Sequence, residues 1–211
     1  MLIFCNNFFS SQEFLVDSKT GDCYITILKN ASTSLKTLAK IIPNRYSIRD
    51  TNFLKYQSIK KVIVFVRDPI ERFLSGISTQ MDIYNLSETS VEKMVNGTTI
   101  SILDAHTIPQ LWSLMSVAKE IDCKFDIRPM DQLNLINSSI KKLNTNTANK
   151  IKLTDNALIK LNHFYTEDIV LFNQFLNKTV SIDEIKKQIL LEKHFIDDLT
   201  QYKECLTFYF K

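Results

Sequence analysis

Apolar runs and helical patterns alternate along the first third of the chain. Residues 61–66, KVIVFV, form a continuous β-branched and aromatic run, which is typical of a strand buried on both faces of a parallel sheet. Two further apolar runs flank the turn-forming sequence at 18–22 and predict a hairpin that ends in a strand at 23–28. Apolar residues at helical spacing follow at 35–42, and Pro43 ends that helix.

The residues after the 61–66 strand carry the signals of a helix start. Asp68 is a suitable N-cap, Pro69 stands at the first helical position, and Glu71 lies three residues after the cap. This pattern predicts a capping box and a helix that begins at Pro69.

The second half of the chain is mostly helical in pattern. Residues 107–121 pair a Thr with a Gln three residues later, the spacing of another capping box, and then repeat apolar residues at helical spacing. Residues 124–130 form a strand candidate, and 154–177 and 182–208 predict long amphipathic helices. Strands that alternate with helices predict an α/β fold, with a mainly parallel central sheet flanked by helices and a helical C-terminal part.

Length and charge limit the number of domains and the kinds of binding partner that we expect. The chain has 211 residues, of which 45% are hydrophobic, enough for one domain with a proper core. We expect a single domain over 1–211, with a core at 22–177 and a helical C-terminal extension at 178–211. The net charge of +3 argues against a nucleic-acid partner but leaves room for a small-anion site. The C-terminal end is rich in Leu, Phe and Tyr, so it either packs on the core or forms a homodimer contact.

Cysteine usage and the N-terminus bear on the compartment. The 4 cysteines lie far apart and form no CxxC pair, which argues against a zinc ribbon or a redox motif and fits a reducing compartment. The first residues, MLIFCNNFF, lack the basic region and the length of a signal peptide. No apolar run approaches the roughly 20 residues of a membrane span. We expect a soluble, cytoplasmic protein without a membrane span.

The first candidate site is the polar stretch at 28–36, LKNASTSLK, between a strand and a helix. A helix N-terminus offers unpaired N–H groups and the positive end of the helix dipole, which suits phosphate or sulfate. Ser32, Thr33 and Ser34 add hydroxyl donors, and Lys29 adds a positive charge. The alternative is that Ser32 or Thr33 caps the helix and Lys29 is solvated, although three hydroxyl residues exceed what one cap requires.

The second candidate site is the strand-to-helix junction. Arg67 ends the buried strand, and ligands of open α/β sheets gather at the carboxyl ends of strands. Ser75 lies about two turns into the next helix, where a guanidinium and a hydroxyl together can hold a terminal phosphate. The alternatives are an ion pair of Arg67 with Asp68 or Glu71, and an ordinary helical position for Ser75.

Both segments resemble motifs of the sulfotransferases. Residues 29–35, KNASTSL, are similar to the 5′-phosphosulfate loop of that family, and residues 67–75, RDPIERFLS, are similar to its 3′-phosphate motif. The Arg-Asp-Pro and Glu-Arg form most resembles the carbohydrate sulfotransferases, the Golgi-type, family 2-like branch. DAHTIPQLW at 104–112 and FYTEDIVLF at 164–172 resemble the His-x-x-Pro-Gln and Tyr-x-x-Asp-x-x-Leu-Phe segments of that branch, in the same order.

The chain also departs from that branch. Leu28 stands where many members carry Pro, and the sequence shows no membrane anchor. The chain is short for a glycan enzyme, which leaves little room for a long oligosaccharide cleft. The missing anchor puts a Golgi location in doubt.

The resemblance implies a P-loop-like three-layer fold and a metal-independent sulfotransferase activity. The sulfuryl group would pass from 3′-phosphoadenosine 5′-phosphosulfate (PAPS) to a hydroxyl of an acceptor, expected to be a carbohydrate, with adenosine 3′,5′-bisphosphate (PAP) as product. Lys29 would be catalytic, meeting the charge of the leaving group, and Arg67 and Ser75 would hold the 3′-phosphate. The 5′-phosphate would be held by Lys29, Asn30, Ala31, Ser32, Thr33 and Ser34.

A general base should take the proton of the acceptor hydroxyl. His106 is the first candidate, because His163 and His194 lie within predicted amphipathic helices. Its alternative role is to cap or brace the helix that starts near Pro109. Asp50, after a predicted short strand, is the second candidate, since some branches of the family carry the base between the two phosphate motifs.

Two other functions stay open on the sequence. A non-catalytic nucleotide-binding protein of the same fold would bind PAP without transferring sulfate. A P-loop kinase needs the Walker A pattern, but residues 28–36 contain no glycine and their first lysine precedes the hydroxyl residues. The kinase would bind ATP with magnesium, whereas a sulfotransferase prefers a 3′-phosphorylated nucleotide.

Overall fold

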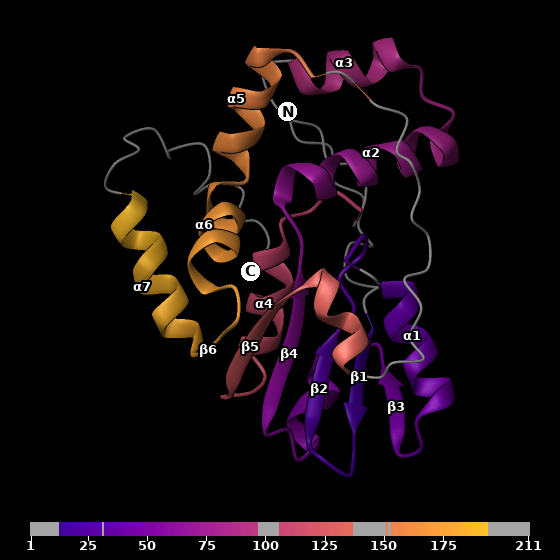
Figure 1. Ribbon diagram of the computed structural model, residues 1–211, viewed down its shortest axis with the longest axis vertical. Helices are drawn as coiled ribbons and strands as arrows, with labels where there is room; N and C mark the ends of the chain where they lie inside the picture. Colours follow the sequence, from indigo (N-terminus) through magenta and orange to yellow (C-terminus); the bar gives the residue numbers. More distant parts are fainter. Residues whose placement is uncertain (1–12, 31, 97–105, 137–150, 152, 194–211) are drawn as a thin grey trace.

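Across the described residues the protein is an α/β fold in which helices flank a six-stranded mixed sheet (Figure 1). The computed structural model describes residues 13–30, 32–96, 106–136, 151 and 153–193. The strands lie in the order β3-β1-β2-β4-β5-β6. They are β1 (Phe14–Asp17), β2 (Asp22–Ile25), β3 (Arg45–Ile48), β4 (Lys61–Val66), β5 (Lys124–Pro129) and β6 (Lys178–Val180).

Two parallel pairings form the centre of the sheet. β4 lies between β2 and β5 and pairs with both in parallel. Every β4 residue after Lys61 is buried, because apolar clusters cover both faces of this strand. The strand predicted at 61–66 is therefore confirmed, and so is the strand predicted from Lys124.

Antiparallel pairings surround this centre, so the sheet is mixed and not mainly parallel as the sequence predicted. The hairpin of β1 and β2 is confirmed, although β2 ends at Ile25 and does not extend to residue 28 as predicted; its turn ends at Gly21, whose φ of 78° is left-handed. The helix α1 (Ser32–Ile41) carries the chain from β2 past β1 to β3, which pairs with the outer side of β1. β6 adds a further antiparallel strand to β5.

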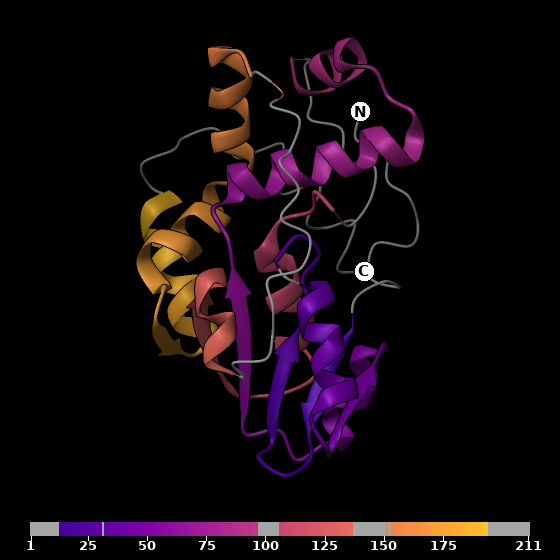
Figure 2. The ribbon, with the colours of Figure 1, turned by 45° about the vertical axis from the view of Figure 1, so that its right-hand side comes forward.

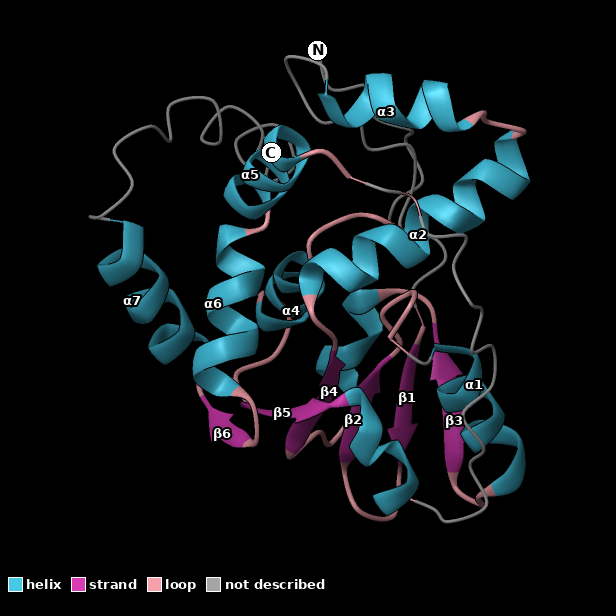
Figure 3. Ribbon diagram, turned by 45° about the horizontal axis from the view of Figure 1, so that its top comes forward, coloured by secondary structure: helices cyan, strands magenta, loops and turns pink. Residues whose placement is uncertain are grey.

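Helices cover both faces of the sheet and its carboxyl edge. α4, α6 and α7 pack on one face with the 3₁₀ helix η1, and α1 packs on the other face with the 3₁₀ helix η2 (Figure 3). α2 crosses the carboxyl ends of the parallel strands and packs with α3 and α5 (Figure 2). The bounds are α2 (Pro69–Tyr84), α3 (Glu88–Asn96), α4 (Gln110–Ala118), α5 (Asp155–Phe164), α6 (Thr166–Phe175), α7 (Ile182–Lys193), η1 (Thr51–Tyr56) and η2 (Met130–Leu135).

The predicted start of α2 is confirmed. The Asp68 side chain accepts the backbone N–H of Glu71 at 2.9 Å, and Pro69 is the first helical residue. Because the missing N–H of proline is not needed in the first helical turn, Pro69 fixes this boundary without loss of a hydrogen bond.

The helix predicted at 154–177 is instead two helices, α5 and α6, which meet at Tyr165. The φ of −95° and ψ of 18° of this residue interrupt the helix. The Tyr165 ring is buried and its hydroxyl donates to the backbone carbonyl of Thr107. A tertiary hydrogen bond thus accompanies the break between α5 and α6, which the spacing of apolar residues in the sequence does not reveal.

The C-terminal part of the described chain belongs to the same core as the sheet. The sequence does not predict β6, and α7 covers only 182–193 of the helix expected at 182–208, since residues from 194 lie outside the described residues. Val180 on β6 and Ile185 and Ile189 on α7 are buried in the cluster that covers the sheet. No helix in the described ranges has both the length and the apolar character needed to cross a membrane.

We predict that Gly76→Ala destabilises the fold, because α2 packs closely on the turn before α4. A Cβ at this position would lie 2.4 Å from the backbone oxygen of His106. Overpacking of this kind costs about 1–3 kcal/mol, part of which the better helix propensity of alanine offsets. Urea unfolding should show a loss of roughly 1–2 kcal/mol, whereas the control Ser78→Ala on the same helix should not. Equal stability of the two variants would contradict the close contact.

Candidate functional site

Lys29 lies in the turn after β2 in a left-handed conformation. Its φ is 68°, a value uncommon for residues with a side chain and often found at functional sites. The half-buried side chain crosses to α2, where Nζ donates a hydrogen bond to the hydroxyl of Thr79. The predicted catalytic lysine therefore connects the first candidate segment to the helix that carries the second.

The three hydroxyl residues of the first segment lie at the start of α1. The helix begins at Ser32, so Ser32 and Thr33 stand inside the first turn and not before it. Ser32 and Ser34 are buried, whereas Thr33 is exposed. Ala31, a predicted phosphate contact, lies outside the described residues. Thr33 is thus the most accessible hydroxyl for an anion at this end of α1.

Two fully buried side-chain amides join the turn after β2 to the end of β4. Asn30 Nδ2 donates to the Phe65 carbonyl at 2.9 Å and to Oε1 of Gln110. Gln110 Oε1 also accepts the backbone N–H of Arg67 at 3.0 Å, and its Nε2 donates to the Arg67 carbonyl at 2.9 Å. These contacts continue the hydrogen bonding of the sheet past the strand ends and hold the two candidate segments together at the carboxyl edge.

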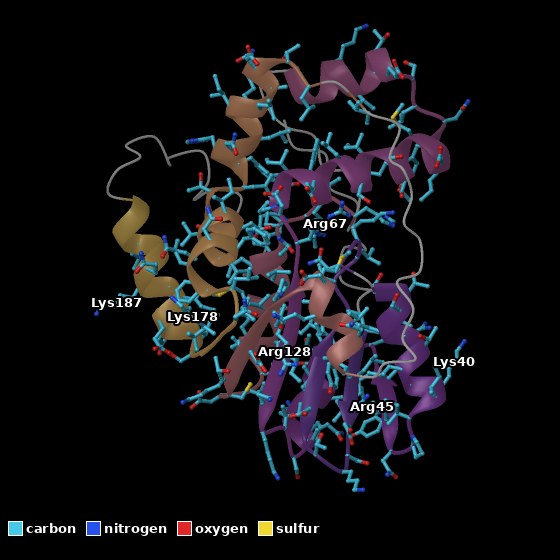
Figure 4. All side chains as sticks on the ribbon, viewed as in Figure 1. Lys40, Arg45, Arg67, Arg128, Lys178 and Lys187 are labelled. Atoms are coloured by element: carbon cyan, nitrogen blue, oxygen red, sulfur yellow. The ribbon has the colours of Figure 1, made fainter. Side chains whose placement is uncertain are left out.

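One face of α2 points the second segment toward the lysine. Arg67 is followed at steps of four residues by Glu71, Ser75 and Thr79. The last three residues belong to α2, and this spacing puts them on one face of the helix. Figure 4 places Arg67 beneath α2, between this helix and the sheet. Because Lys29 reaches Thr79, its side chain lies one helical turn from the half-buried Ser75.

The Arg67 side chain makes the ion pair that the sequence offered as an alternative. Its Nε lies 3.3 Å from Glu71 Oε2. The Arg67 side chain keeps 30% of its surface exposed and that of Glu71 keeps 66%. A solvent-exposed pair of this kind contributes about 0–1 kcal/mol, so a phosphate can displace the glutamate from the guanidinium.

The adjoining face of α2 is buried and includes a charged residue. The Arg72 guanidinium has no exposed surface; its Nε donates to the Leu28 carbonyl at 3.1 Å and Nη1 donates to the Ile108 carbonyl at 2.5 Å. Burial lowers the pKa of Arg72, while Tyr165 and Asp168 act in the opposite direction. The second arginine of the RDPIER run thus holds the loops on which the site is built.

Asp168 on α6 satisfies the N-terminus of α4. Its carboxylate accepts the backbone N–H groups of Gln110 at 2.6 Å and Leu111 at 2.8 Å. The sequence predicted this capping role for Thr107 and was wrong, since the Thr107 hydroxyl instead accepts a hydrogen bond from Gln80 at 3.3 Å. Burial raises the pKa of the Asp168 carboxyl to about 6, although the two N–H groups act in the opposite direction.

The two candidate bases lie in different surroundings. His106 is half-buried in the turn before α4, and its backbone packs against Gly76, the residue after Ser75. Asp50 is exposed and caps η1, because its Oδ1 accepts the backbone N–H of Asn52 at 2.9 Å and the side-chain amide at 3.0 Å. The structure thus brings His106 to the helix of the second segment and gives Asp50 a local structural contact.

Three buried polar residues hold the site together without having been predicted to do so. Arg72, Gln110 and Asp168 all lie in segments that resemble the sulfotransferases, yet periodicity gives them no role. The signal that could have found them is chemical. A charged or amide side chain among buried positions of a helix requires a hydrogen-bond partner, and therefore indicates a tertiary contact.

We predict that Asp168→Asn removes a pH dependence of stability. A carboxyl whose pKa rises on folding stabilises the fold below its ordinary pKa near 4, and that contribution is lost as the pH rises through about 6. Between these limits the free energy of unfolding of the wild type should fall by as much as roughly 3 kcal/mol relative to the variant. Chemical unfolding from pH 4 to 7 measures the difference, with Asp155→Asn, an exposed carboxylate of α5, as the control. Parallel curves for wild type and Asp168→Asn would contradict it.

Comparison with known proteins identified no relative of this chain. No family model matches the chain, and no curated protein or solved structure matches it either. The chemistry of the site therefore rests on its residues and their arrangement at the carboxyl edge of the sheet.

Proposed function

We propose that the protein is a sulfotransferase that moves a sulfuryl group from PAPS to a hydroxyl of an acceptor, with a carbohydrate as the expected acceptor. One observation carries the proposal. The two segments that resemble the donor-binding motifs meet at one edge of the sheet, through the contact of Lys29 with Thr79 and the bonds of Gln110 to Asn30 and Arg67. This proximity of segments far apart in the chain supports a shared ligand.

The proposed chemistry uses groups that this edge provides. Lys29 offers an ammonium at the start of the loop, and the first turn of α1 offers backbone N–H groups and the Thr33 hydroxyl for the 5′ end of the donor. Arg67 and Ser75 lie on the α2 side for the 3′-phosphate. A donor held at both ends would present its sulfur in a fixed direction to the acceptor hydroxyl.

The proposal is tested by a binding experiment and a transfer experiment. Calorimetry should show that PAP binds more tightly than ATP with magnesium, and the reverse order would favour a kinase. A screen of glycans, lipids and small alcohols with radiolabelled PAPS should then show transfer that Lys29→Ala abolishes. Binding of PAP without transfer to any acceptor would identify a non-catalytic nucleotide-binding protein.

We predict that Lys29 and Arg67 act at different steps. Lys29→Ala should lower kcat by about 100-fold or more and change the Kd of PAP only a few-fold, because a charge on the leaving oxygen develops in the transition state. Arg67→Ala should weaken PAP binding by roughly tenfold to a hundredfold, through loss of a charged hydrogen bond. Lys36→Ala, a lysine of α1 that pairs with Glu13 at 3.5 Å, is the control. Equal losses of affinity in the two site variants would refute this division.

The identity of the base follows from pH–rate profiles. We predict that His106→Ala removes the acid limb of kcat, because the unprotonated ring takes the proton of the acceptor hydroxyl. Asp50→Asn should keep this limb, since its carboxylate caps η1. An acid limb that persists in His106→Ala and disappears in Asp50→Asn would assign the base to Asp50.

A further inference from the structure

Gln110 is a residue whose side chain bonds to both candidate segments at once. Its side chain accepts a hydrogen bond from Asn30 in the first segment and makes two with the backbone of Arg67 in the second. Its backbone N–H is fixed at 2.6 Å from Asp168, so the side chain extends from an anchored helix start. The residue is fully buried and therefore does not itself contact solvent.

The orientation of both amides is determined by their partners. Asn30 Nδ2 faces two acceptors, the Phe65 carbonyl and Gln110 Oε1, so its donor side must point this way. Gln110 pairs with the N–H and the carbonyl of one residue, Arg67, as a neighbouring strand would. A carboxamide in this position specifies the distance between the two segments, because neither the donor nor the acceptor can be lost without leaving a buried group unpaired.

We propose that Gln110 is a positioning residue that couples the two phosphate subsites. A nucleotide with phosphates at both ends then gains affinity by occupying both subsites at once. This inference rests on the proposed function. The affinity increases because, once the first phosphate is bound, the second subsite already lies at the right distance to bind the second phosphate. Without the bridge each subsite still binds its own phosphate, but the distance between the subsites varies and the gain declines.

The test compares ligands that occupy one subsite or both. Calorimetry measures the Kd of PAP, of adenosine 5′-monophosphate and of adenosine 3′-monophosphate for wild type and for Gln110→Met, which keeps the volume and removes the hydrogen bonds. The preference for PAP over each monophosphate should fall by about tenfold in the variant, a typical coupling between residues of one network. The affinity for each monophosphate should change by less than about threefold.

Gln80→Met is the matched control. Gln80 is also fully buried, and it donates to the Thr107 hydroxyl, so its replacement loosens the same turn before α4. Its variant should show a comparable loss of thermal stability with the preference for PAP unchanged. If Gln110→Met does not fold, Gln110→Glu replaces it, since the glutamate keeps the shape and loses the donor to the Arg67 carbonyl; it too should lower the preference.

The outcomes separate this inference from the proposed function. PAP binding to wild type with an unchanged preference in folded Gln110→Met, or in Gln110→Glu where it replaces Gln110→Met, would overturn the coupling and leave the donor site standing. A preference lowered equally in Gln80→Met would also overturn it, because a general loosening of the fold would then explain the effect. Absence of PAP binding to wild type would instead overturn the proposed function itself.

Discussion

Burial of the Arg72 guanidinium is the constraint on which the carboxyl edge of the sheet depends. A cation without solvent contact is tolerated only where its donors find acceptors and an opposite charge lies near. Arg72 meets this requirement with the carbonyls of Leu28 and Ile108, and Asp168 acts on it electrostatically. Since these carbonyls belong to the turn that contains Lys29 and to the turn before α4, Arg72 fixes both turns relative to α2.

Local sequence patterns predict the secondary structure correctly where residues close together in the chain determine the conformation. The run at 61–66 became the central strand, and Asp68 with Pro69 began a helix, because β-branched apolar residues and a capping carboxylate act within a few residues. The break at Tyr165 and the strand β6 could not be predicted in this way. Tyr165 bonds to Thr107, far away in the sequence, and β6 is a three-residue strand that exists through its pairing with β5.

The candidate site shows the same division between local and tertiary causes. Lys29 and Arg67 were predicted from strand ends, helix starts and a motif resemblance, and the structure brings their segments together. The cap of α4 was assigned to Thr107 because of its spacing. Asp168 takes that role, since a carboxylate from a neighbouring helix reaches two backbone N–H groups at once. Only a folded chain reveals such a partner.

The left-handed backbone of Lys29 makes the stability of the turn and the presence of a side chain there conflicting requirements. A φ of 68° costs a residue with a side chain about 1–3 kcal/mol, a strain that glycine does not experience. Glycine at this position would therefore favour the fold while removing the ammonium that reaches α2. The contact of Lys29 with α2 is therefore made at a cost in backbone strain that a glycine in the same turn would avoid.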